Sequence, residues 1–309
     1  SSPTMTAKFG NRIKIMEIHM VLFTDTDCDI TPEIAKKYNF QLISMPYIID
    51  GEEVYPYKSW DTFDSHGFYQ MLRERKTNLP TTCGISEENY REYFEPWFAK
   101  GEDIFYVHFS AAMTTTFDSM HAALDKLKEK YPERKFYEVD AKGITIGAYN
   151  IVVEIGDMFL KGKTVEEVLK WAETEVDKFA IYFFADDLKF FHKSGRVKGL
   201  SAFMGGLVGV RPIINMDSRG VMDSVGKALG RKNALNALID KVKELGDEIK
   251  AHRIVISSGD APELEALVEK ALKVEFGYDL WIEHVLLNPT AGAHCGPDGV
   301  GISFHAKHR

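Results

Sequence analysis

The stretch "MVLFTDTDCDITPEIAKKYNF", residues 20–40, passes from apolar to acidic and then to amphipathic residues. Its first letters form a short apolar run that is typical of a buried strand. The acidic segment at 24–29 follows, and Thr31 with Pro32 then supplies an N-cap and a first helical position. A strand that passes through a polar loop into a helix is the repeating unit of parallel sheets, so this stretch predicts an α/β fold.

The same alternation continues outward along the chain. Strand-like runs occupy 103–111 and 135–141, with helical patterns at 86–98 and 114–131. After about residue 180 the alternation becomes less regular. We therefore expect two α/β domains: an N-terminal one at 18–180 with a mainly parallel sheet flanked by helices, and a C-terminal one at 181–309 with a mixed sheet and helices.

Composition narrows the classes of function. The 309 residues carry a net charge of −8, which argues against nucleic acid as a partner. No run of eighteen apolar residues predicts a transmembrane segment, and the first twenty residues lack the apolar region of a secretory signal. Three cysteines without a CxxC pair are typical of a reducing compartment. We expect a cytoplasmic protein without a disulfide framework or a metal site.

A second unusual stretch is "LLNPTAGAHCGPDGVGISF", residues 286–304. It has few side chains with which to fill a core, and it surrounds His294 with Gly, Ala and Pro. Glycines permit a close approach of backbone to a ligand, and a neutral imidazole can hydrogen-bond an anion. One interpretation is a bare loop that closes over a ligand. The alternative is a tight turn with an incidental histidine.

Polar side chains gather in three further segments. Two of them follow predicted strands, and one precedes a predicted helix. The segments are "TDTDCD" at 24–29, "LPTTCGIS" at 79–86 and "FSAAMTTTF" at 109–117. The carboxyl ends of parallel strands form the usual ligand crevice of such sheets. Each segment can also be explained by helix capping and turn hydrogen bonds alone.

Taken together, six segments resemble the DegV family in order and spacing. They are "TDTDCDI", "PTTCGIS", "SAAMTTTFDS", "LKFFHKSGRV", "VRPII" and "AHCGPDGVGISF", and the resemblance covers about residues 20 to 305. DegV proteins are bacterial fatty-acid-binding proteins that present acyl chains to a fatty acid kinase. The resemblance implies a long-chain fatty acid held in a tunnel between two domains, no cofactor and no catalytic activity of the chain itself.

The resemblance also implies the residues that hold the carboxylate. The family's threonine, helix-start hydroxyl and histidine fall on Thr82, Thr114 and His294. Ser110 matches a further family serine, and Cys83 stands where the family has serine. Segments 183–191 and 200–210 are candidate apolar walls of the tunnel, and each of their residues fits an ordinary core at least as well.

The resemblance to kinase-serving members is incomplete. Arg196 of "KSGRV" is present and is expected to contact a partner or the acyl phosphate. A basic "KVR" segment of such members reads "KAL" here, with Lys227 kept and Leu229 in place of arginine. The use of a kinase partner is therefore an open expectation.

Two enzymatic alternatives remain. "VLFTDTDCD" resembles the nucleophile motif of haloacid-dehalogenase phosphatases, with Asp25 and Asp27 as the two aspartates and Asp186 and Asp187 as a Mg²⁺-binding pair. Asp29 stands where that motif has threonine or valine, and the reading leaves 286–304 unexplained. A thiol enzyme built on Cys295 and His294 is disfavoured, because neighbours on an extended chain point to opposite sides.

Overall fold

The computed structural model describes residues 4–9, 12–17, 19–203 and 208–309. A four-stranded sheet is entirely parallel, as predicted for the N-terminal half. Its strands lie in the order β4 (Phe40–Ile43), β3 (Met20–Asp25), β8 (Asp103–His108) and β9 (Phe136–Asp140).

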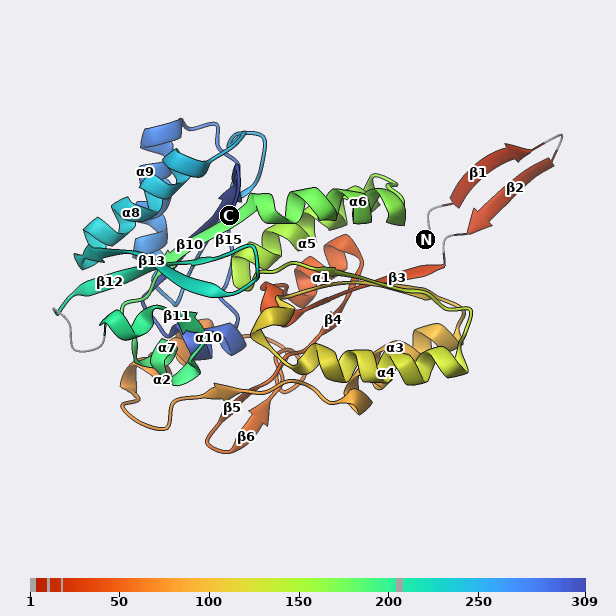
Figure 1. Ribbon diagram of the computed structural model, residues 1–309, viewed down its shortest axis with the longest axis horizontal. Helices are drawn as coiled ribbons and strands as arrows, with labels where there is room; N and C mark the ends of the chain where they lie inside the picture. Colours follow the sequence, from red (N-terminus) through yellow and green to blue (C-terminus); the bar gives the residue numbers. More distant parts are fainter. Residues whose placement is uncertain (1–3, 10–11, 18, 204–207) are drawn as a thin grey trace.

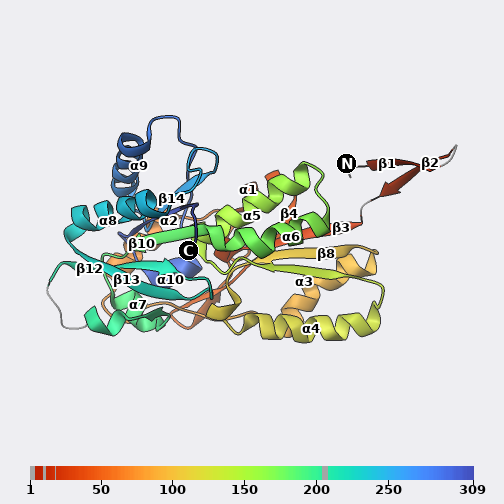
Figure 2. The same ribbon diagram turned by 45° about the horizontal axis from the view of Figure 1, so that its top comes forward.

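Helices cover both faces of this sheet (Figures 1 and 2). Two begin at predicted caps: Thr31 accepts a hydrogen bond from the backbone nitrogen of Ile34, and Ser86 accepts one from that of Asn89. One face carries α3 (Glu87–Ala99) and α4 (Thr116–Lys130), and the other carries α1 (Pro32–Tyr38), α5 (Thr145–Leu160) and α6 (Val165–Glu175).

The second sheet is mixed, as predicted, and has seven strands among the described residues. Its order is β11 (Val197–Lys198), β13 (Met222–Leu229), β12 (Val210–Met216), β10 (Phe179–Phe184), β16 (Val300–His305), β14 (Ile254–Ser258) and β15 (Ile282–His284). Helices α8 (Gly230–Leu245) and α9 (Pro262–Phe276) pack against it. Strand β13 was not predicted, because its residues "MDSVGKAL" lack a clear alternation of polar and apolar residues.

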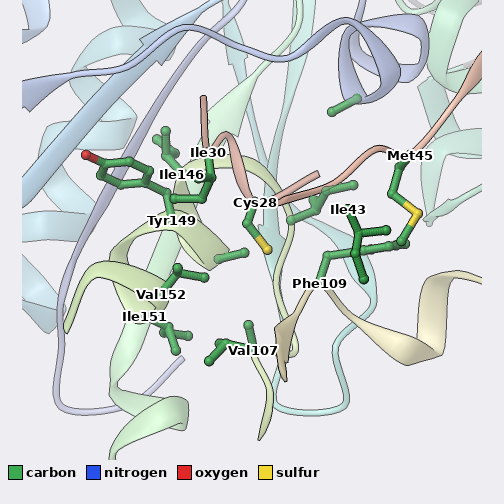
Figure 3. Packing of buried hydrophobic residues seen from close by; sticks show 14 of the residues in the cluster. Cys28, Ile30, Ile43, Met45, Val107, Phe109, Ile146, Tyr149, Ile151 and Val152 are labelled. Atoms are coloured by element: carbon green, nitrogen blue, oxygen red, sulfur yellow. The ribbon is translucent and has the colours of Figure 1, made fainter. Parts of the chain in front are cut away.

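Helix α5 joins the two sheets. It contacts β8 of the first sheet and β10, β14 and β16 of the second, and most of its residues are buried. Figure 3 shows Ile146, Tyr149, Ile151 and Val152 of this helix among the buried side chains of the core. Such a helix is apolar nearly all round because it faces protein on both sides. The predicted domain boundary at residue 180 falls within β10, and the division into domains stays a prediction.

Smaller elements complete the fold. A hairpin of β1 (Thr4–Phe9) and β2 (Arg12–Glu17) extends away from the rest of the chain (Figure 1). A three-stranded antiparallel sheet contains β6 (Glu52–Val54), β5 (Tyr47–Ile49) and β7 (Thr81–Thr82). Further helices are α2 (Ser65–Glu74) and α7 (Lys189–Ser194). The short 3-10 turns are η1 (Thr26–Cys28), η2 (Ala111–Met113), η3 (Val176–Lys178) and η4 (Leu200–Phe203). Within the described ranges, none of the helices has the length and apolar character needed to cross a membrane.

The stretch around His294 forms a helix, α10 (Pro289–Cys295), so the prediction of a bare loop is wrong. Asn288 caps it by accepting a hydrogen bond from the backbone nitrogen of Ala291 at 2.9 Å, and Pro289 occupies its first turn. The helix is buried, and its small residues permit close packing: a Cβ at Gly292 would overlap the hydroxyl of Tyr69. The small side chains therefore belong to the core after all.

Candidate functional site

A cavity of about 450 Å³ opens beside α10, the turn η1 and the loops that follow β7 and β8. Six of the residues that line it were singled out from the sequence. They are Asp27, Thr82, Cys83, Thr114, Arg196 and His294. Segments more than two hundred residues apart in the chain thus meet at one polar site.

Thr82 and His294 are in direct contact. Thr82 Oγ1 lies 3.0 Å from His294 Nε2. This contact joins the short strand β7 to the last turn of α10. Burial, followed by the nearby charge of Arg196, lowers the pKa of His294 to about 3. The imidazole is therefore neutral at physiological pH, and it can take part in hydrogen bonds without adding charge to the cavity.

Thr114 lies at the end of η2 and also lines the cavity. Its hydroxyl oxygen accepts a hydrogen bond from the backbone nitrogen of Thr116 at 3.0 Å. That contact leaves the hydroxyl proton available to a ligand, because a hydroxyl both accepts and donates. Cys83 also lines the cavity, and its thiol points toward the carboxylate of Glu53 at 3.8 Å.

Ser110 is not among the residues that line the cavity, and its placement among the ligand-binding residues stays a prediction. Its side chain is fully buried and donates a hydrogen bond to the carbonyl oxygen of Gly220 at 2.6 Å. The hydroxyl thereby ties the end of β8 to the turn that connects β12 and β13. The donor of this hydroxyl is thus used within the protein, and its oxygen can still accept a hydrogen bond.

Arg196 brings a positive charge to the cavity. Its Nε donates to the carbonyl of Met113 at 3.2 Å, and its Nη1 donates to the carbonyl of Ser194 at 3.3 Å. Burial lowers the pKa of Arg196, but a guanidinium remains protonated in proteins. A contact with a partner or an acyl phosphate stays a prediction. Lys227 and Leu229 are exposed on β13.

The phosphatase alternative finds no support in the geometry of Asp25. This side chain is fully buried, and its Oδ2 accepts hydrogen bonds from the Tyr106 hydroxyl at 2.8 Å and from the Phe109 backbone at 3.2 Å. The Cys28 thiol donates to the other oxygen at 3.4 Å. A carboxylate held in this way braces the core and is not accessible for attack on phosphorus.

The two carboxylates of the acidic pair that the phosphatase alternative assigns to Mg²⁺ are paired with basic side chains. Asp186 accepts hydrogen bonds from Arg211 at 2.6 Å and from Arg231 at 2.8 Å, and Asp187 pairs with Lys189 at 3.2 Å. No cluster of metal-ligating side chains occurs in the part of the chain that the structure describes.

Sequence reasoning missed the role of Asp29. Its Oδ1 accepts hydrogen bonds from the backbone nitrogen of Asn288 at 2.9 Å and from its side-chain nitrogen at 2.7 Å. Asn288 in turn caps α10, so Asp29 fixes the start of the helix that carries His294. The signal in the sequence was an N-cap residue directly before Pro289.

An apolar channel adjoins the polar cavity. Met113, Ile144 and His294 line both spaces, so the two meet at these side chains. The channel is small, with a volume of about 50 Å³. The predicted wall segment 183–191 contributes Phe183, Phe184, Ala185 and Phe191 to its lining. Of the other predicted wall, 200–210, residues 204–207 lie outside the described residues, and its described residues do not line the channel.

Comparisons with known proteins agree with this architecture. A family model described as "Uncharacterised protein, DegV family" matches residues 19–307. DegV domain-containing protein CPE0026 of Clostridium perfringens is 27% identical over 289 residues, which cover 92% of this chain and 96% of the relative.

Two solved structures are similar throughout. A DegV family protein of Thermus thermophilus, described for its fatty acid binding, has a TM-score of 0.81 at 20% identity and covers 94% of this chain and 100% of that one. A DegV family protein of Ruminococcus gnavus, solved with vaccenic acid, has a TM-score of 0.80 at 20% identity and covers 93% and 99%. These likenesses confirm the predicted fold class.

Proposed function

Because this chain belongs to the DegV family, we propose that it binds a long-chain fatty acid, with the carboxylate in the polar cavity and the acyl tail in the apolar channel. The observation that carries the proposal is the contact of Thr82 with His294 at the junction of the two spaces. Relatives with the same fold are described as binding fatty acids, including vaccenic acid.

The two spaces divide the binding energy. Burial of about 14 methylenes at roughly 0.8 kcal/mol each contributes roughly 11 kcal/mol before the costs of ordering. Hydrogen bonds to the charged head group add about 1.5–3 kcal/mol each. The tail therefore supplies most of the affinity, and Thr82, Thr114 and His294 set the direction of the ligand.

The channel must widen to admit a tail. A space of about 50 Å³ has room for only a few water molecules. Met113 lies at the junction and is the most adaptable side chain there, because an unbranched thioether changes rotamer at low cost. We expect Met113 to move first when a tail enters.

The proposal includes a partner. The bound carboxylate would be presented to a fatty acid kinase in the cytoplasm, and Arg196 would contact the partner or the acyl phosphate. Arg196 lines the cavity, and a guanidinium pairs well with phosphate oxygens. Both facts support a contact of Arg196 with the partner or the acyl phosphate. Leu229 on β13 removes a second positive charge that such a partner would use in other members.

Native mass spectrometry of protein purified from bacteria tests the proposal directly. We expect a bound mass that matches a fatty acid and that disappears after delipidation. A parallel incubation with Mg²⁺ and a phosphomonoester should release no phosphate above the blank. Phosphate release that vanishes in Asp25→Asn would overturn the proposal in favour of a phosphatase.

A further inference from the structure

The polar cavity contains an acid that its proposed ligand does not explain. Asp27 lines the cavity, is 5% exposed, and belongs to the turn η1 that follows β3. Its Oδ1 is buried and has no hydrogen-bond partner among the described residues. A buried polar atom without a partner costs free energy, and Asp27 belongs to the lining of a ligand cavity. A rotation of its carboxyl group toward that cavity would give the unpaired oxygen a ligand as its partner.

The negative charge of the proposed ligand limits the protonation state that Asp27 can adopt beside it. Two carboxylates cannot both be ionised at close range in a desolvated site without strong repulsion. A protonated carboxyl, in contrast, donates a short and strong hydrogen bond to a carboxylate. The remaining charge of the ligand is then balanced by Arg196, which also lines the cavity.

We propose that Asp27, in its protonated form, donates a hydrogen bond to the carboxylate of the bound fatty acid, so that the site holds its ligand as an acid–carboxylate pair. The inference rests on the proposed function and adds a specificity-determining residue to it. The pair favours ionised acids over amines, because a protonated carboxyl beside Arg196 offers no negative charge to a cationic head group.

The surroundings of Asp27 support the protonated form. Burial, followed by the nearby carboxylates of Asp25 and Asp29, raises the pKa of Asp27 well above its ordinary range, and the charge of Arg196 opposes that rise. The other titratable groups that face it or share its cavity are Cys28, Cys83, Tyr90 and His294. Burial raises the pKa of each of the two thiols and of Tyr90, and His294 is neutral, so Arg196 supplies the positive charge near Asp27.

The test is a fluorescence titration with cis-parinaric acid, whose emission rises in apolar surroundings, between pH 6.5 and 9.5. Wild type is compared with Asp27→Asn, which keeps a donor without a charge, with Asp27→Ala, which has none, and with Asp61→Asn, an exposed control. At pH 6.5 we expect Asp27→Ala to bind about tenfold more weakly and Asp27→Asn to match wild type. Toward alkaline pH, wild type and Asp61→Asn should lose affinity and Asp27→Asn should not. Neither variant at position 27 should unfold at lower temperature than wild type, because Oδ1 has no partner to lose.

Three outcomes would overturn the inference while leaving fatty acid binding intact. The first is equal affinity of Asp27→Ala and wild type at pH 6.5. The second is a parallel loss of affinity in Asp27→Asn and wild type as the pH rises. The third is tighter binding by Asp27→Asn at pH 6.5, since it would show that an ionised Asp27 repels the ligand. Absence of binding to wild type at every pH would instead overturn the proposed function and the inference together.

Discussion

The carboxylate of Asp29 accepts two hydrogen bonds from Asn288, from the backbone nitrogen at 2.9 Å and from the side-chain nitrogen at 2.7 Å. Asn288 also accepts a hydrogen bond from the backbone nitrogen of Ala291 at 2.9 Å. One residue thus links the turn after β3 to the first turn of α10, which ends with His294 and Cys295. Asp29 is a positioning residue, because it acts on the site through the helix that it anchors.

Replacement of Asp29 should therefore affect both folding and binding. We expect Asp29→Ala to lower the free energy of unfolding by about 1–3 kcal/mol, because the buried donors of Asn288 lose their acceptor. The backbone φ of 56° at this position adds strain for alanine. Asp29→Asn is the matched control, since it keeps an acceptor oxygen and tolerates this conformation. Urea unfolding measures the difference, and equal midpoints for the two variants would contradict it.

The same residue predicts a dependence of stability on pH. Burial raises the pKa of Asp29 to about 7 from an ordinary value of 3.8, against the opposing hydrogen bonds from Asn288. Between these values the folded state holds a proton that the unfolded state has released. The stability contributed by Asp29 should thus fall as the pH rises from about 4 to about 7. Thermal unfolding of wild type and Asp29→Asn across this range should show a smaller decline in the variant.

The head-group contacts predict selective losses of affinity. Thr82→Val and His294→Ala should each weaken fatty acid binding by about 1–3 kcal/mol, which is roughly tenfold to a hundredfold. Both should largely spare the matching fatty alcohol, because it carries no charge that needs hydrogen bonds. Competition of palmitic acid and hexadecanol against a fluorescent fatty acid measures the ratio. Equal losses for acid and alcohol would place the carboxylate elsewhere.

Because α10 is closely packed, the addition of one methyl group at Gly292 should lower the stability of the fold. Gly292→Ala should destabilise the fold by about 1–3 kcal/mol, because the new Cβ overlaps the hydroxyl of Tyr69. That hydroxyl donates to the carbonyl of Leu287 at 2.8 Å, so it cannot move freely. The double variant Tyr69→Phe with Gly292→Ala removes the overlapping oxygen. A penalty for Gly292→Ala that is the same on the Tyr69→Phe background as on wild type would contradict this explanation.

Much of the fold was predictable from local signals. The cap Thr31 and Pro32 mark the start of α1 correctly, and apolar runs mark β3 and β8. Helix α10 was not recognised, because its seven residues, most of them small, show no helical periodicity and only its cap at Asn288 signals its start. The run of Gly, Ala and Pro was interpreted as a loop. Small residues are equally suited to a buried helix that packs closely against neighbouring elements.

The site was less predictable than the fold. His294 and Thr82 were found through their resemblance to family motifs, and the structure brings them together. Ser110 was assigned to the ligand by the same resemblance, but Gly220 takes its hydrogen bond. The separate roles of Asp25, Asp27 and Asp29 follow from which atoms face them in the folded chain, and spacing along the sequence carries no such information.

The contact between Thr82 and His294 spans 212 positions of the chain. A ribosome that has made only the first sheet has produced one side of the cavity and none of α10. If the proposed function holds, the growing chain cannot hold a fatty acid until α10 has emerged and docked. A bound fatty acid would then mark a chain in which α10 is in place, and in cells short of lipid proteases should clear the empty copies faster, because the ligand stabilises only the native state.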